Sequence, residues 1–240
     1  MAQGRLPCKP AWGCTESPMT FSVIALDPYD GCLGVACATG SPGVGGFVPH
    51  LLPGVGAAIT QGYSTHVLAA EQGLAHLAER EPVTTVVAAL HQADRGAAWR
   101  QLALMDIQGR VAGWTGERNV PFMDMHLAAG LVVAGNMLAS ERVVPAMVAA
   151  FQKARSRGDP LAEALLATLA AGRAEGGDQR GTVSAALKVR SPGGVPYDLR
   201  IDDDADAVLA LSRLHQRIRE DRDFQAFLGR LPDATDPHRH

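Results

Sequence analysis

The sequence predicts an α+β fold in which two antiparallel β-sheets stack face to face and helices cover their outer faces. Three observations support this prediction. Predicted strands occur mainly in pairs separated by turn residues, predicted helices follow one another in pairs, and the strands are almost continuous runs of Val, Ala, Leu and Gly. Sheets built of such residues must be covered on both faces. The grouped order also differs from the strict strand–helix alternation of a doubly wound parallel sheet.

The first predicted hairpin begins at Thr20 and ends at Thr39, with strands at 20–26 and 33–39. The hexapeptide between the strands is rich in Asp, Pro and Gly, which is typical of a turn. This turn pairs Thr20 with Thr39, and the two-residue period of a strand puts Thr20 and Ser22 on the same face. We therefore expect three hydroxyls at the open end of the hairpin, with Ser22 and Thr39 as candidate substrate-binding residues, although threonine pairs also occur in purely structural strands.

A glycine-rich segment from Gly40 to Gly46 follows this hairpin. It contains no lysine and lacks the Gly-Lys-Ser/Thr ending of a phosphate-binding loop. The next run, at 54–61, is typical of a strand and not of the helix that a dinucleotide-binding unit requires. We therefore expect a flexible loop that lines the rim of a pocket.

The middle of the chain continues with two helices, a second hairpin and a further strand. Apolar residues at three- and four-residue spacing predict the helices, and Gln108-Gly109 provides the short turn of the hairpin. The further strand is a β-rich run that ends at Gly135-Asn136. In chain order these elements cover 64–80, 82–94, 101–107, 110–115 and 127–134.

The C-terminal part contains another pair of amphipathic helices, then two strands and a last helix. The acidic run Asp202-Asp203-Asp204, together with Asp206, directly precedes the last helix. These carboxylates could bind a cation, but we expect them to cap the helix, because negative charge is favoured at a helix N-terminus. In chain order these elements cover 140–155, 160–173, 182–190, 197–201 and 206–221.

Length and composition indicate one globular domain, which we place at 19–225. A chain of 240 residues with 47% hydrophobic and 20% charged residues can bury a large core. Residues 1–18 hold three prolines and no apolar run that fits a signal sequence or a membrane anchor, so we expect a disordered leader or a propeptide. Residues 226–240 are expected to form a polar tail. We expect a soluble, cytoplasmic protein.

The charge pattern and the metal-ligand candidates argue against several kinds of partner. The formal charge of −3 is spread without a basic stripe, so we expect neither nucleic acid nor a membrane surface as a partner. The four cysteines form no Cys-x-x-Cys pair and the eight histidines no His-Glu-x-x-His helix, so we expect no metal site and no cofactor. The expected ligand is a small-molecule substrate, and a helical exterior rich in Ala and Val fits a homo-oligomer.

Thr20 opens the first strand directly after Met19. A threonine whose own α-amine is free carries its base on the same residue and can act as a nucleophile on an amide. The amine becomes free if translation starts at Met19, which is then removed, or if a propeptide is cut between the two residues. The alternative is that Thr20 is an ordinary β-branched strand residue, which the spacing alone favours.

Four further residues are candidates for the same site. Asn136 stands where a strand ends and could donate a hydrogen bond to an oxyanion, or could simply cap a turn. Gln61 closes a predicted buried strand and could bind substrate through its amide. In the glycine-rich loop around Asp178 and Arg180, the arginine could hold a carboxylate while the aspartate orients it. The alternative for this loop is an ordinary surface ion pair.

Several short motifs, specific in combination, are spread along the chain between Met19 and Leu214. They are Met19-Thr20-Phe21-Ser22, Gly34-Val35-Ala36, Val48-Pro49, Gly54-Val55-Gly56-Ala57, Thr60-Gln61, Gln101-Leu102, Gly135-Asn136-Met137-Leu138, Gly176-Gly177-Asp178-Gln179-Arg180-Gly181 and Asp198-Leu199-Arg200-Ile201-Asp202-Asp203. Together they resemble the DUF1028 family, which is placed among the N-terminal nucleophile (Ntn) hydrolases.

The resemblance implies a four-layer αββα fold and makes Thr20 the position of the nucleophile, against the interpretation that its spacing alone favours. The family usually begins at the Met-Thr pair, so a leader is atypical. No lysine lies between Thr20 and Gln152, so the lysine that assists the threonine in proteasome-like members has no counterpart in the first sheets. The family is regarded as uncharacterised, so the resemblance implies a type of chemistry but no particular substrate.

The resulting hypothesis is a hydrolase that cleaves a non-peptide carbon–nitrogen bond, an amide of a small metabolite, through an acyl intermediate on Thr20. Arg180 is the candidate for recognising a carboxylate on that metabolite. A rival within the enzymes is deamination of an enamine or imine, which needs activated water and no acyl-enzyme. A rival of another class is a non-catalytic binding or assembly protein on the same scaffold, with Thr20 internal and inert.

Overall fold

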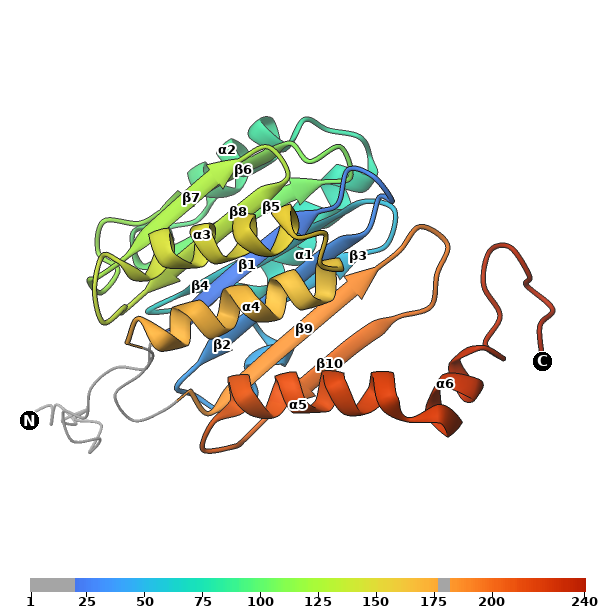
Figure 1. Ribbon diagram of the computed structural model, residues 1–240. Coiled ribbons are helices and arrows are strands. Elements are labelled where there is room, and N and C mark those ends of the chain that lie inside the picture. The colour runs from blue at the N-terminus through green and yellow to red at the C-terminus, as the bar shows by residue number, and fades with distance from the viewer. Residues whose placement is uncertain (1–19, 177–181) are drawn as a thin grey trace, which may run out of the picture.

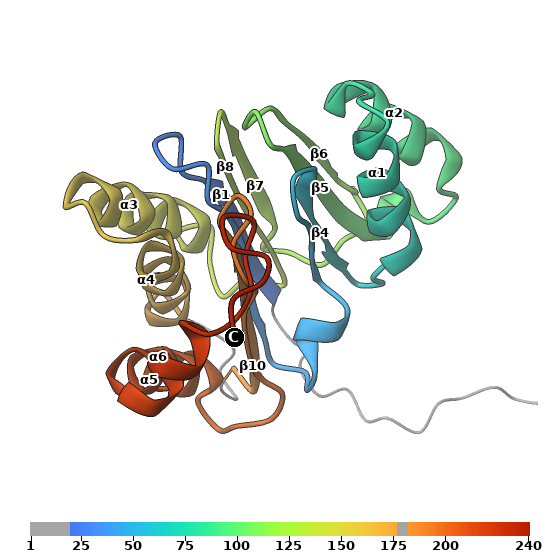
Figure 2. The same cartoon turned by 90° about the vertical axis from the view of Figure 1, so that its right-hand side faces the viewer.

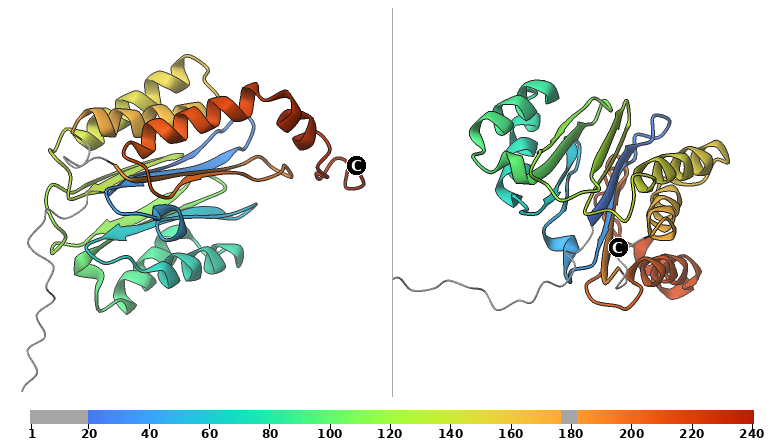
Figure 3. Two further views of the ribbon diagram at one scale, coloured as in Figure 1. Left: turned by 90° about the horizontal axis from the view of Figure 1, so that it is seen from below. Right: turned by 90° about the vertical axis from the view of Figure 1, so that its left-hand side faces the viewer.

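The computed structural model describes residues 20–176 and 182–240, and these residues form four layers (Figure 1). Two antiparallel β-sheets lie face to face in the middle, and helices cover the outer face of each sheet (Figures 2 and 3). The predicted αββα arrangement of two stacked antiparallel sheets is therefore confirmed.

The larger sheet has six strands in the order β10-β9-β2-β1-β8-β7. Its strand β1 pairs with β2 on one side and with β8 on the other, and both pairs are antiparallel. The predicted register of the first hairpin is confirmed, because Thr20 lies opposite Thr39 and Leu26 lies opposite Leu33. The strands are β1 Thr20–Leu26, β2 Leu33–Thr39, β7 Asp124–Ala128, β8 Leu131–Asn136, β9 Ser184–Arg190 and β10 Tyr197–Ile201.

The smaller sheet has four strands in the order β3-β4-β5-β6. Antiparallel pairing places Gln61 opposite Gln101, and Gln101 opposite Thr115. Three polar residues from three neighbouring strands therefore lie at the same end of this sheet. The strands are β3 Pro49–Leu52, β4 Gly56–Gly62, β5 Arg100–Asp106 and β6 Val111–Thr115.

Helices α1 and α2 cover the smaller sheet, and α3, α4 and α5 cover the larger one (Figure 2). Asp206 accepts a hydrogen bond from the backbone N–H of Leu209 and so caps α5, as the acidic run predicted. No helix in the described part of the chain combines the length and the apolar character needed to cross a membrane. The helices are α1 Val67–Ala78, α2 Val83–Ala93, α3 Val143–Ser156, α4 Leu161–Ala174, α5 Ala207–Glu220 and α6 Arg222–Leu228.

Three apolar layers hold the sheets and helices together. Phe21 and Leu165 belong to the layer between the larger sheet and its helices. Leu104 belongs to the layer between the smaller sheet and α1 and α2. Ile24 and Ile59 belong to the third layer, which lies between the two sheets. Phe21 and Ile24 of the same strand thus point to opposite faces, as the two-residue period of a strand requires.

Some elements differ from the sequence prediction. The run predicted as one strand at 127–134 is a hairpin of β7 and β8, because Gly130 adopts φ +74° and lets the chain reverse. Strand β3 was not predicted, since its four residues are too few to establish an alternating pattern. Helix α6 was not predicted either, and it crosses residue 226, where we expected the polar tail to begin. The limits of the domain stay a prediction.

Candidate functional site

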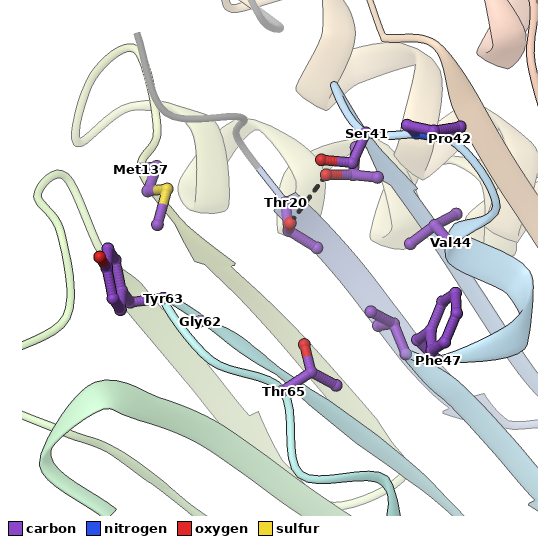
Figure 4. A pocket seen from close by; sticks show the side chains of 11 residues that line it. Thr20, Ser41, Pro42, Val44, Phe47, Gly62, Tyr63, Thr65 and Met137 are labelled. Atoms are coloured by element: carbon purple, nitrogen blue, oxygen red, sulfur yellow. Dashed lines mark hydrogen bonds between the residues drawn. The ribbon is translucent and has the colours of Figure 1, made fainter. Parts of the chain in front are cut away.

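A cavity of about 380 Å³ opens beside the first residue of β1, where the ends of both sheets meet. Its wall combines hydroxyl groups with apolar side chains, and none of the described residues that line it carries a charge. Figure 4 shows Thr20 between the loop that carries Ser41 and the segment that carries Tyr63. The described lining residues are Thr20, Thr39, Ser41, Pro42, Val44, Phe47, Val48, Gly62, Tyr63, Thr65 and Met137.

Thr20 is held between two neighbours that the strand register places on either side of it. Thr39 of β2 and Asn136 of β8 both lie opposite Thr20. The hydroxyl oxygens of Thr20 and Thr39 are 2.9 Å apart and share a hydrogen bond in which either residue can donate (Figure 4). Thr20 is only 9% exposed, so its hydroxyl meets the cavity from a largely buried position.

The layer between the sheets changes from apolar to polar as it approaches Thr20. Along β1 the inward-facing residues pass from Ile24 to Ser22 and Thr20, and along β4 they pass from Ile59 to Gln61. These polar side chains are buried, so each needs a hydrogen-bond partner inside the protein. Packing the two sheets together does not require polar residues here, and this end of the layer is therefore the candidate site.

Gln101 of β5 is the centre of a buried hydrogen-bond network that joins the two sheets. Its Oε1 accepts hydrogen bonds from Gln61 Nε2 at 2.9 Å and from Asn136 Nδ2 at 3.2 Å. Its Nε2 donates to Thr115 Oγ1 at 3.0 Å and to the carbonyl oxygen of Asp124 at 3.1 Å. Both hydrogens and both lone pairs of the Gln101 amide are therefore used.

The carbonyl oxygen of Asp124 sets the direction of the hydrogen bonds in this network. A carbonyl oxygen can only accept, so the Gln101 atom that faces it must be the nitrogen. The Gln101 oxygen then faces Gln61 and Asn136, and both must donate to it. Gln61 in turn presents its own oxygen to Ser22, whose hydroxyl donates at 2.5 Å. The network consequently has one orientation.

Asn136 has one buried polar atom without a partner. Its Nδ2 donates to Gln101, whereas its Oδ1 has no hydrogen-bond partner among the described residues. A buried acceptor without a donor is rare and costly in folded proteins. We expected Asn136 to act as a donor, and the structure shows that the unpartnered atom is an acceptor, with one hydrogen of Nδ2 also remaining.

Met137, which follows Asn136 and lines the cavity, has an uncommon backbone conformation. Its φ is +54°, a left-handed value that non-glycine residues rarely adopt. The backbone N–H of Met137 donates to the carbonyl of Val120 at 2.9 Å, and that of Leu138 donates to the carbonyl of Phe122 at 2.8 Å. Residues held in such conformations by their surroundings cluster at functional sites.

The glycine-rich segment after β2 forms one side of the cavity, as the sequence predicted. Ser184 of β9 holds this segment in place. Its Oγ donates to the carbonyl oxygen of Ser41 at 2.5 Å and accepts from the backbone N–H of Val44 at 3.1 Å. The segment ends in a 3-10 turn, η1 Val44–Gly46, which the sequence did not predict.

Tyr63 forms another part of the wall and belongs to an exposed aromatic group. The centre of its ring lies 5.4 Å from that of Trp99, and the guanidinium carbon of Arg118 lies 5.9 Å from the centre of the Trp99 ring. Gly62, the preceding residue, has φ +122°, and a Cβ atom on it would lie 2.7 Å from the backbone oxygen of Trp99. This close approach of two backbone segments requires glycine.

Two other reactive residues, Cys37 and His50, lie beside residues of the cavity wall, but neither is among the described residues that line the cavity. Cys37 belongs to a small apolar cluster with Val44 and Val48. Burial raises the pKa of its thiol well above the usual value, so Cys37 stays neutral and acts as a packing residue. Burial lowers the pKa of His50, whose Nε2 lies 3.1 Å from the carbonyl oxygen of Phe47.

The structure brings five of the predicted site residues together at the polar end of the layer between the sheets. They are Thr20, Ser22, Thr39, Gln61 and Asn136. Thr20 and Thr39 line the cavity, whereas the other three are at most 1% exposed and lie behind it. The other two predicted residues, Asp178 and Arg180, lie outside the described residues.

Sequence reasoning assigned no role to Gln101, the centre of the network. A signal was present, because Gln101 begins one predicted strand and Gln61 ends another. Antiparallel pairing of those two strands would have placed the two amides side by side. Ser184 and Met137 were also missed. Met137 occurs in one of the family motifs, but the contacts of both residues come from distant parts of the chain and could not be predicted from local patterns.

One group of side chains in the described part of the chain has the spacing to hold a metal ion. The ligand atoms of His76, Glu79 and Glu81 lie within 4.8 Å of one another. None of the three lines the cavity, and His76 Nδ1 is already 2.8 Å from Glu81 Oε1. Acidic groups at a protein surface commonly approach one another in this way, and we assign no metal to them.

Fold and site together define a class of protein: a four-layer αββα sandwich whose central strand ends in a hydroxyl-lined cavity above a buried network of amides. A family model described as "Family of unknown function (DUF1028)" matches residues 20–211. The chain belongs to the DUF1028 family, as its motifs indicated.

Two solved structures are similar to this chain. The crystal structure of protein SPO2555 from Silicibacter pomeroyi, assigned to the same family, has a TM-score of 0.84 and 33% identity, and the match covers 92% of this chain and 98% of that one. The structure titled Anbu (ancestral beta-subunit), from Yersinia bercovieri, has a TM-score of 0.42 and 11% identity over 88% of this chain and 97% of that one. The search of curated proteins found no match.

Proposed function

We propose that this protein is an N-terminal-threonine hydrolase that cleaves the carbon–nitrogen bond of a small, non-peptide amide through an acyl intermediate on Thr20. The proposal places the chain among the Ntn hydrolases, as the resemblance of its motifs implies. The observation that carries the proposal is the position of Thr20. It is the first residue of a central strand, it lines the cavity, and its hydroxyl is bonded to that of Thr39.

The proposed chemistry uses Thr20 both as nucleophile and as base. Its free α-amine takes the hydroxyl proton while Oγ1 attacks the amide carbon, and a tetrahedral oxyanion forms. The carbon–nitrogen bond then breaks, the ammonium group gives its proton to the leaving amine, and an ester remains on Thr20. Water attacks this ester while the same α-amine accepts its proton, and the ammonium then returns this proton to Oγ1 as the acid product leaves and threonine is restored.

In this proposal, neighbouring polar groups orient the nucleophile, stabilise the oxyanion and support the substrate site. The Thr39 hydroxyl orients that of Thr20. Asn136 retains one amide hydrogen besides the one bonded to Gln101, and it is our candidate donor to the oxyanion. Ser22 and Gln61 bond to each other behind the cavity, so in this proposal they support the substrate site from beneath.

The size and lining of the cavity favour a small substrate. Its volume of about 380 Å³ lies at the lower end of the range for ligand pockets. The described lining offers hydroxyl and apolar contacts to the part of the substrate next to Thr20. Arg180, oriented by Asp178, remains our candidate for binding a carboxylate further from the reacting bond.

The first test is the intact mass and the N-terminal sequence of the protein purified from its own host without an N-terminal tag. The proposal requires a chain that begins at Thr20, because a peptide bond to Met19 would remove the base. A chain that keeps its leader, and that turns over no amide, would contradict the proposal and favour a binding or assembly role.

The second test replaces the nucleophile. In a screen of small amides, Thr20→Ala should lower turnover at least about a thousand-fold, because removal of a nucleophile leaves only binding and oxyanion stabilisation. An electrophilic probe should form an ester with Thr20 Oγ1, detected on the N-terminal peptide of the wild type, and the variant has no hydroxyl at this position to form it. Thr84→Ala, on the exposed face of α2, is the matched control. Undiminished activity in Thr20→Ala would contradict the assignment of Thr20 as the nucleophile. Turnover without a trapped acyl-enzyme would favour a deaminase.

A further inference from the structure

We propose that Gln101 is a positioning residue, which holds Asn136 with its side-chain oxygen free to accept a hydrogen bond from the α-amine of a mature Thr20. The inference rests on the proposed function, since it concerns a chain in which Thr20 is the first residue. It assigns a role to a buried network that a purely structural strand pair would not need.

The first step is the fixed orientation of Gln101. The residue is fully buried, and each hydrogen and lone pair of its amide is used. A flip of this amide would place its oxygen against the carbonyl oxygen of Asp124, and two acceptors would then face each other. Gln101 therefore presents an oxygen, and never a nitrogen, to Asn136.

The second step is the consequence for Asn136. Because its Nδ2 must face the Gln101 oxygen, its Oδ1 must point to another side, where the described residues offer it no donor. Asn136 lies directly opposite Thr20 in the antiparallel pair of β1 and β8. Side chains opposite each other in such a pair have Cβ atoms about 5 Å apart. The unpartnered oxygen thus belongs to the residue beside the proposed nucleophile.

The third step is the change that release of the amine makes. In the full chain the nitrogen of Thr20 is a peptide nitrogen with a single hydrogen. After cleavage before Thr20 it is an amine with two hydrogens, or an ammonium with three, and it can turn about its bond to Cα. This group supplies the donor that the buried Oδ1 of Asn136 lacks. A hydrogen bond to the ammonium also stabilises the charged form and raises the pKa of the amine.

The experiment measures the pKa of the α-amine in a chain that begins at Thr20. The rate at which a small acylating reagent modifies the amine follows the neutral fraction, and the mass of the N-terminal peptide reports it between about pH 6 and about pH 9, around the usual α-amino pKa. Asn136→Ala and Gln101→Met should each lower this pKa by about one unit, the size expected for loss of one hydrogen bond to a charged group.

Two further variants separate positioning from a merely structural effect. Gln101→Glu should not lower the pKa of the amine, because a neutral glutamic acid can donate from one carboxyl oxygen to the Asp124 carbonyl and present the other oxygen to Asn136 as an acceptor. Val133→Ala lies on the same strand as Asn136 but faces the helices, so it should reduce stability and leave this pKa unchanged. If Asn136→Ala leaves the pKa unchanged, the inference is wrong whether or not Gln101→Met folds. If Asn136→Ala lowers it and a folded Gln101→Met does not, Gln101 has no positioning role.

The readout does not depend on knowing the substrate. A pKa that responds to Asn136→Ala in a protein that turns over no amide would support the positioning role and count against the proposed function. Turnover that depends on Thr20, together with an amine pKa that neither Asn136→Ala nor Gln101→Met changes, would support the proposed function and count against the positioning role.

Discussion

At the scale of single residues, the site depends on short polar side chains whose positions are set by strand register. Thr20 faces Thr39 on one side and Asn136 on the other because β1 is paired along both edges. A threonine hydroxyl is a poor nucleophile at neutral pH unless a base lies next to it. The bond between Met19 and Thr20 therefore decides whether this residue can act as a catalyst or serves only as part of a strand.

Glycine at position 62 is expected to be essential for the cavity wall. Its φ is +122°, and a Cβ atom there would lie 2.7 Å from the backbone oxygen of Trp99. Gly62→Ala should lower the free energy of unfolding by at least about 2 kcal/mol, because it adds backbone strain and a clash with main-chain atoms. Chemical denaturation followed by circular dichroism measures this change.

Gly54→Ala is the matched control for this prediction. Gly54 also has a positive φ, +73°, but nothing lies within 4 Å of an added Cβ atom. It should cost only about 1 kcal/mol, the strain of a left-handed alanine. Equal losses in the two variants would show that the contact with Trp99 does not matter.

At the scale of elements, α5 docks on β9 and β10 through an apolar face and one polar contact. Its buried residues Val208 and Leu211 belong to the layer under the larger sheet. The hydroxyl of Tyr197 on β10 lies 2.7 Å from Nδ1 of His215 on α5, and the two rings meet edge to face. Nε2 of His215 is buried and has no hydrogen-bond partner in the described part of the chain. The polar contact between α5 and β10 therefore depends on His215 being neutral.

Acidification should loosen this attachment. Burial lowers the pKa of His215 below its ordinary value of about 6.5, so in mildly acidic solution the unfolded chain binds a proton more readily than the folded one. The stability that depends on neutral His215 is complete above that ordinary value and is lost as the pH falls through it toward the lower folded pKa. The urea midpoint of the wild type should therefore fall between about pH 7.5 and about pH 5.5.

His215→Gln should show a smaller fall over the same range, since glutamine can bond to Tyr197 and does not titrate. Burial lowers the pKa of His50 too, so part of the pH dependence should remain in the variant. His238→Gln, in the exposed C-terminal tail, is the matched control. An equal fall in the wild type and in His215→Gln would contradict the prediction.

At the scale of the whole molecule, one shared layer of side chains joins the two sheets. Ile24 and Val132 of the larger sheet meet Ile59 and Met105 of the smaller sheet in its apolar part. The Gln101 network joins the sheets in its polar part. Neither sheet can bury its inner face alone, so we expect the sheets to unfold together. The homo-oligomer expected from the sequence stays a prediction.

A cavity in the shared layer should weaken the whole protein. Ile59 is fully buried, and Ile59→Ala should lower the free energy of unfolding by about 2–5 kcal/mol while the transition stays a single step. Leu127→Ala, on the edge strand β7, is the control and should cost less than about 1 kcal/mol, because Leu127 is 40% exposed. Two separate transitions in Ile59→Ala, detected by circular dichroism and tryptophan fluorescence, would show that the sheets unfold independently.

Much of the fold could be predicted from the sequence because patterns of neighbouring residues specify most of its strands and helices. Strands at 20–26 and 33–39 coincide with β1 and β2, since turn residues bound two apolar runs of equal length. Helix pairs were predicted from apolar spacing, with ends that differ by a few residues. The hairpin of β7 and β8 was missed because Gly130 sits inside a run whose apolar character continues on both sides.

The sequence by itself determined the grouped order of elements, the pairing of Thr20 with Thr39 and, through its motifs, membership of the family. These follow from contacts between residues that are near in the chain, or from short patterns within it. Only the tertiary structure decided that Gln101 joins two sheets, that Ser184 holds the rim of the cavity and that the Asn136 oxygen has no hydrogen-bond partner among the described residues. A hydrogen bond between distant strands depends on how whole sheets are stacked, and no local pattern in the chain encodes that stacking.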